Sequence, residues 1–125
     1  MRRGRPLFGA LGGLGVVMAL APLIADAAHA RSPAYVGTWA SSRQQCRIDQ
    51  SRQNAPLILR RNGYDQHEAH CTFASVSQAG AGAWRARARC SVEGDRQNHT
   101  ITLTVRGNRL TLREGRGSRL LMRCH

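Results

Sequence analysis

The stretch Trp84-Arg85-Ala86-Arg87-Ala88-Arg89-Cys90-Ser91-Val92, residues 84–92, alternates apolar and polar side chains without interruption. Alternation with a period of two predicts a β-strand with one face in a core and the other in solvent. The prediction places Trp84, Ala86 and Ala88 in the core, and Arg85, Arg87 and Arg89 in solvent. A shift of one residue would bury three unpaired charges at a high cost in free energy, so the register is strongly specified.

The same period continues in the neighbouring segments. Residues 100–106 and 110–113 alternate in the same way, and Gly107-Asn108 between them is a two-residue hairpin signal. We predict further strands at 35–40, 56–60 and 119–124, one or two strands within 64–78, and turns at Gly63, 78–83 and 115–117. The polar segment 41–55 is predicted to be a long loop that can hold a helical turn. About seven short strands predict an all-β fold, a small antiparallel meander forming a closed or half-open barrel, with a sandwich as the alternative.

The first thirty residues have the pattern of a secretory signal peptide. Arg2, Arg3 and Arg5 precede an apolar stretch at 7–24, and Ala28-His29-Ala30 fits the small-x-small cleavage pattern. We predict a signal peptide at 1–30, periplasmic or secreted localisation in a bacterium, and no stable membrane span after cleavage. The predicted single domain, 31–125, holds sixteen arginines, no lysine and six carboxylates, which gives a net charge of +10.

Disulfides are expected to stabilise this domain. A domain of 95 residues buries only about 60–65% of its unfolded surface. All four cysteines, Cys46, Cys71, Cys90 and Cys124, follow the predicted cleavage site, and an even number in a short exported chain predicts two disulfides. Three pairings are possible. One of them follows from a hairpin turning at Gly80-Ala81, which would place Cys71 opposite Cys90 and leave Cys46 for Cys124.

Two motifs contain residue types used in catalysis or metal binding. His67-Glu68-Ala69-His70-Cys71 is one residue short of the H-E-x-x-H zinc helix, and in a strand His67 and His70 would face opposite sides. Glu93 and Asp95 flank Gly94 beside Arg96, which is typical of a salt-bridged turn. Nothing resembles a nucleophile elbow. The sequence therefore predicts a non-enzymatic protein with no metal and no cofactor.

Arg85, Arg87 and Arg89 form the strongest candidate binding surface. Their spacing puts three guanidinium groups on one face of a strand at intervals of about 6.5–7 Å. Guanidinium groups bind phosphate and carboxylate bidentately, so the candidate partners are lipopolysaccharide phosphates, anionic lipid headgroups or an acidic protein. Nucleic acid is less favoured, since export separates the protein from it and aromatic residues are only 5% of the chain. A merely solubilising face is the alternative. The neighbouring hairpins add Arg106, Arg109, Arg113, Arg116 and Arg119.

Gly37-Thr38-Trp39, Cys46-Arg47-Ile48 and Cys71 carry a family resemblance. Over residues 35–71 the chain resembles the small secreted inhibitors of bacterial serralysin-type metalloproteases, barrels that begin with a Gly-x-Trp strand and hold one nearby disulfide. The resemblance implies a periplasmic barrel with a Cys46–Cys71 disulfide, which leaves Cys90 for Cys124. These last two cysteines have no counterpart in the family. We take this pairing as our prediction, and protease inhibition through residues 31–34 as the alternative function.

Overall fold

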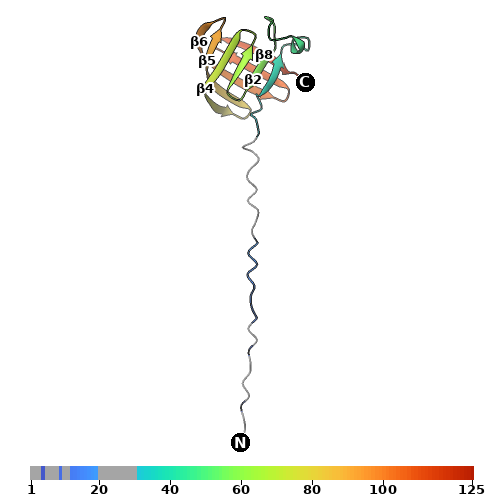
Figure 1. Ribbon diagram of the computed structural model, residues 1–125, viewed down its shortest axis with the longest axis vertical. Coiled ribbons are helices and arrows are strands. Elements are labelled where there is room, and N and C mark those ends of the chain that lie inside the picture. Colours follow the sequence, from blue (N-terminus) through green and yellow to red (C-terminus); the bar gives the residue numbers. More distant parts are fainter. Residues whose placement is uncertain (1–3, 5–8, 10–11, 20–30) are drawn as a thin grey trace.

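Eight antiparallel strands form one closed barrel in chain order (Figure 1). The structure is a computed structural model that describes residues 4, 9, 12–19 and 31–125, so the predicted cleavage site at Ala30 and much of the predicted signal peptide lie outside the described residues. β8 pairs with β1 and closes the sheet on itself, which removes its edges. The all-β meander is confirmed, and the barrel is closed. Its elements are β1 (Gly37–Ala40), the 3-10 helix η2 (Gln45–Arg47), β2 (Leu57–Arg60), β3 (Gly63–Gln66), β4 (Ala69–Gly80), β5 (Ala83–Val92), β6 (Asp95–Arg106), β7 (Arg109–Glu114) and β8 (Gly117–Arg123).

Two-residue turns join the later strands. Glu93 and Gly94, between β5 and β6, have φ values of +50° and +87°, as a type I′ turn requires. Gly107 provides the positive φ after β6, as the sequence predicts. Gly63, however, begins β3 instead of forming a turn, and the turn lies at 61–62. A Cβ atom at Gly63 would clash with the carbonyl oxygen of Cys71, so the close approach of β3 to β4 requires glycine there.

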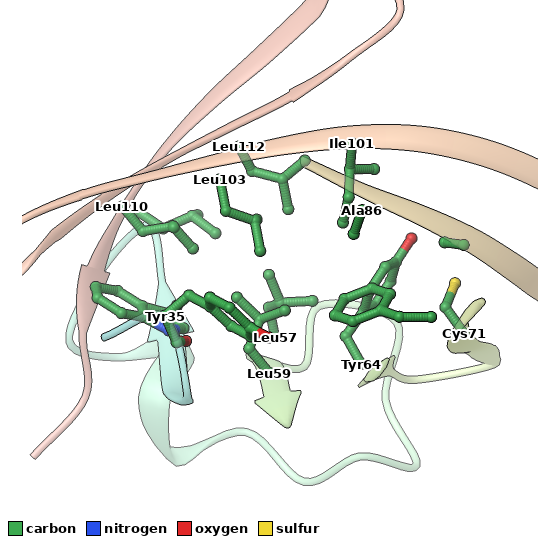
Figure 2. Close-up of a cluster of buried hydrophobic side chains, with 14 of the residues drawn as sticks. Tyr35, Leu57, Leu59, Tyr64, Cys71, Ala86, Ile101, Leu103, Leu110 and Leu112 are labelled. Atoms are coloured by element: carbon green, nitrogen blue, oxygen red, sulfur yellow. The ribbon is translucent and has the colours of Figure 1, made fainter. Parts of the chain in front are cut away.

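Inward-facing side chains fill the barrel. Figure 2 shows apolar side chains of β5, β6 and β7 facing Tyr35 and side chains of β2 and β3. Trp39 is fully buried, as predicted, and its indole N–H donates a hydrogen bond to the Tyr35 carbonyl oxygen at 2.8 Å. The buried cluster comprises Tyr35, Trp39, Leu57, Leu59, Tyr64, Cys71, Phe73, Ala86, Ala88, Cys90, Ile101, Leu103, Leu110, Leu112 and Leu121.

The disulfides are Cys46–Cys124 and Cys71–Cys90, so the predicted pairing of Cys46 with Cys71 and of Cys90 with Cys124 is wrong. Cys71 and Cys90 are register partners on β4 and β5, both buried, with Cα atoms 4.0 Å apart. Cys71 therefore faces Cys90 inside the barrel, whereas Cys46 belongs to η2 in the 41–55 loop and bonds the residue that follows β8. Two disulfides indicate an oxidising, extracytoplasmic environment.

Candidate anion-binding face

Arg85, Arg87 and Arg89 lie on β5 and are exposed to solvent, while Ala86 and Ala88 between them are buried. The predicted assignment of the two faces is therefore confirmed for these residues, and Trp84, which was also predicted to lie in the core, is half-buried against it. Within residues 31–125, none of the three guanidinium groups is in an ion pair with a carboxylate. We call these three residues the arginine row.

Small polar side chains flank the arginine row on both neighbouring strands. Every register partner of the row carries a hydroxyl or amide group. On β4 these partners are Ser77, Ser75 and Thr72, and on β6 they are Thr102, Thr100 and Asn98, in the order of Arg85, Arg87 and Arg89. Such groups can donate hydrogen bonds to an anion without neutralising the guanidinium charge. Beyond β6, Arg113 is the partner of Thr102 and extends the basic surface onto β7.

The carboxylates of the domain lie elsewhere, and none is a register partner of the arginine row. Asp65 on β3 forms ion pairs with Arg60 and His70. Glu114 at the end of β7 is paired with His99 at 2.6 Å. The others are Asp49 in the 41–55 loop, Glu68 and Glu93 in turns, and Asp95 at the start of β6.

A shallow depression of about 360 Å³ opens beside the arginine row. Arg87 and Arg89 line it together with Asn98 and Thr100. Ala74 also lines it, at the register shift between Phe73 and Ser75 on β4. A second depression, of about 510 Å³, is lined by Arg89, Asn98 and Arg96 among others. A phosphate or carboxylate group fits the chemistry of this surface, because guanidinium and amide N–H groups and hydroxyls all donate hydrogen bonds there.

The other five arginines that were named from the sequence do not all lie on the same surface. Arg106 and Arg109 are exposed register partners at one end of β6 and β7, Arg113 is exposed on β7, and Arg116 lies in the β7–β8 turn. Arg119 does not belong to this outer surface. It is the register partner of buried Leu112, and its guanidinium donates a hydrogen bond to the Gln66 side-chain oxygen at 3.1 Å.

The fold places the two motifs with catalytic or metal-binding residue types side by side: the Glu93 N–H donates a hydrogen bond to the Glu68 carbonyl oxygen at 3.2 Å, and residues of both motifs line one shallow depression. His67 lies in the β3–β4 turn with its Nδ1 3.0 Å from the Gln50 carbonyl oxygen, while the Nδ1 of His70 contacts Asp65 at 2.8 Å. In the described part of the chain, no group of three histidine, cysteine or acidic residues could hold a metal ion. Glu93 and Gly94 form the predicted turn. The expected salt bridge with Arg96 is wrong, since no ion pair within 31–125 includes Arg96.

Sequence reasoning missed a polar cluster at one end of the barrel. The imidazole of His99 contacts Glu114 through Nδ1 and lies 2.8 Å from the Gln97 side-chain oxygen through Nε2. Burial raises the pKa of the nearby Tyr64 hydroxyl, Glu114 raises it further, and Arg119 opposes the shift. The signal was present in the sequence, because Gln97 and His99 continue the alternation that places Ile101 and Leu103 in the core.

Comparisons with protein-family models, with curated proteins and with solved structures gave no match to this chain. Among the described residues, the search for helices long and apolar enough to cross a membrane found none.

Proposed function

We propose that the protein is an exported, non-enzymatic β-barrel, released by cleavage after Ala30, that binds an anionic surface through Arg85, Arg87 and Arg89. One observation carries the proposal: three exposed guanidinium groups stand side by side on β5, flanked by hydroxyl and amide groups, with no carboxylate among their register partners. Phosphate-bearing lipid or lipopolysaccharide headgroups present repeated anions to such a row. An acidic partner protein is the other ligand of this chemistry.

The distribution of charge supports a binding role over a solubilising one. Neighbouring like charges repel, and a face that only confers solubility is best served by interspersed charges of both signs. The domain has six carboxylates that could neutralise the row, yet three of them lie within ion-pair distance of other basic side chains and the rest lie in the loop, a turn or the start of β6. An anionic ligand would reduce the electrostatic repulsion among the three guanidinium groups of the arginine row.

Co-sedimentation with lipid vesicles tests the proposal. The wild-type protein should bind vesicles containing phosphatidylglycerol at low salt and should not bind vesicles of phosphatidylcholine alone. Binding should fall as ionic strength rises, because the Debye length shortens from about 30 Å at 0.01 M to about 3 Å at 1 M. The variant R85E/R87E/R89E should lose binding while its thermal midpoint stays within a few degrees of the wild type, since these side chains are exposed.

A matched control separates the face from net charge. R31E/R52E/R61E changes three exposed arginines away from β5 and alters the charge by the same amount. This control should keep most of the vesicle binding. Equal loss in both variants would show that overall charge, not the arginine row, is responsible. If vesicles are ignored and a periplasmic extract yields an acidic protein that binds the wild type but not R85E/R87E/R89E, the ligand is that protein.

Protease inhibition through residues 31–34 is the alternative taken from the family resemblance. The segment is attached to the barrel by two arginines: Arg61 donates to the Arg31 carbonyl oxygen at 3.3 Å, and Arg123 donates to that of Ala34 at 2.8 Å. Tyr35, which follows, is buried. An arm entering a protease cleft would have to give up these contacts, so we favour anion binding. Deleting residues 31–34 should abolish inhibition if it occurs and should leave anion binding intact.

A further inference from the structure

A second basic depression, of about 550 Å³, lies where the 41–55 loop is joined to the end of β8. The Cys46–Cys124 disulfide forms part of its lining and fixes the loop against the residue that follows β8. Arg43 and Arg47 line it from the loop, and Met122 lines it from β8. Figure 1 shows the loop and the C-terminal end on the same side of the barrel.

Two guanidinium groups at this depression are available to bind a ligand. Arg43 and Arg47 are exposed, and neither is in an ion pair within residues 31–125. Arg123, which also lines the depression, is occupied: its guanidinium donates to the carbonyl oxygens of Val36 and Ala34 and stacks on the Trp39 ring at 4.2 Å. The side chains that line the depression include no carboxylate. Three arginine side chains outweigh the one α-carboxylate of His125, which also lines the depression, so the charge balance of the site favours an anion.

The surface beside these guanidinium groups is apolar. Met122 is 42% exposed, and Leu120, two residues earlier on the same face of β8, is 64% exposed. Within residues 31–125 the only other exposed large hydrophobic side chain is Val76 on β4. A ligand that matched both the guanidinium groups and the apolar surface beside them would carry an anionic head and an alkyl chain.

We propose that this depression binds an anionic amphiphile, with its phosphate or carboxylate head on Arg43 and Arg47 and its alkyl chain along Met122 and Leu120. The head would accept charge-assisted hydrogen bonds from the two guanidinium groups. The chain would cover apolar side chains that otherwise contact water. The site contains no member of the arginine row, so it stands independently of the function proposed above.

Isothermal titration with octyl phosphate below its critical micelle concentration tests this site. Octyl phosphate should bind at least about tenfold more tightly than inorganic phosphate, because only the former has a chain to bury. Octyl glucoside, which has the chain without the charge, should bind at least about tenfold more weakly than octyl phosphate. Equal affinity for octyl phosphate and inorganic phosphate, or for octyl phosphate and octyl glucoside, would overturn the proposal.

Variants of the lining residues test where octyl phosphate binds. R43Q/R47Q and L120S/M122S should each reduce octyl phosphate affinity about tenfold or more, whereas R52Q, in the same loop, and R85Q/R87Q/R89Q should not. All these side chains are exposed, so the variants should fold. Loss in R85Q/R87Q/R89Q with R43Q/R47Q unchanged would assign the ligand to β5 and refute the site. If R43Q/R47Q also weakens phosphatidylglycerol vesicle binding, the ligand is a bilayer lipid; if it weakens octyl phosphate alone, the ligand is a free amphiphile.

Discussion

Tyr35 and Tyr64, the two tyrosines of the chain, show how single residues link this fold to pH. Tyr35 is buried, and its hydroxyl donates a hydrogen bond to the Arg61 carbonyl oxygen at 2.7 Å. Tyr64 is 6% exposed and lies beside the polar end of the barrel. Burial raises the pKa of both hydroxyls above the ordinary value, and Arg61 partly offsets the shift at Tyr35. The folded protein therefore holds these protons more tightly than the unfolded chain.

This difference predicts alkaline unfolding. A raised folded-state pKa contributes stability that is present below the unfolded pKa, about 10, and is lost as pH rises through the folded value. Absorbance at 295 nm, followed together with far-UV circular dichroism, should show both tyrosines ionising above pH 10 as the structure is lost. In denaturant the ionisation midpoint should return to about 10. Ionisation of both near pH 10 with an unchanged dichroism spectrum would show that these side chains are not buried.

At the scale of elements, the sequence predicts strands well wherever one face is apolar and the other polar. Residues 84–92 and the hairpin around Gly107-Asn108 lie as the alternation predicts. The first strand was placed too early, since Tyr35 and Val36 precede β1. Tyr35 is nevertheless a core residue, because it packs edge-on against Trp84. Alternation locates strands, but the packing of a residue outside a strand depends on tertiary contacts that the pattern does not contain.

The disulfide pairing shows where a resemblance misled the prediction. The hairpin alternative placed its turn at Gly80-Ala81, whereas the turn lies at 81–82. Two register shifts, between Gln78 and Gly80 and between Phe73 and Ser75, bring Cys71 opposite Cys90 all the same. A bulge shifts the phase of the alternation by one residue, and the mostly polar, exposed stretch 74–79 has too few apolar side chains to reveal that shift.

We predict different stability losses for the two disulfides. In the loop-entropy model, Cys46–Cys124, which spans 78 positions, should stabilise the fold by about 4.5 kcal/mol, and Cys71–Cys90, which spans 19, by about 3 kcal/mol. Urea denaturation of C46A/C124A should show a loss near the first value. C71A/C90A should lose at least the second, because it also leaves a cavity in the core.

Peptide mapping without reduction should recover residue 71 joined to residue 90. A fragment joining residues 46 and 71 would contradict the fold.

Across the whole molecule, three of the six carboxylates of the domain gather at one end of the barrel. Glu68, Glu93 and Glu114 lie in or beside the β3–β4, β5–β6 and β7–β8 turns, which share one end of an antiparallel barrel. The arginine row occupies the outer surface of β5. The sequence alone predicted that Arg85, Arg87 and Arg89 face outward, because that follows from the period of a strand, but it wrongly added Arg119 to the same surface. The basic depression at Arg43 and Arg47 could not be predicted, because it depends on a disulfide between segments 78 positions apart.

If the proposed function is correct, an anion binds Arg85, Arg87 and Arg89 in preference to the other arginines of the domain. The most direct measurement follows the arginine Nε–Hε signals of the ¹⁵N-labelled protein by NMR while tripolyphosphate, a soluble polyanion, is added. The Arg85, Arg87 and Arg89 signals should show saturable shifts at concentrations that leave those of Arg52 and Arg61 in place. If all five signals shift together without saturation, the anion is attracted by net charge alone, and the arginine row is not a binding site.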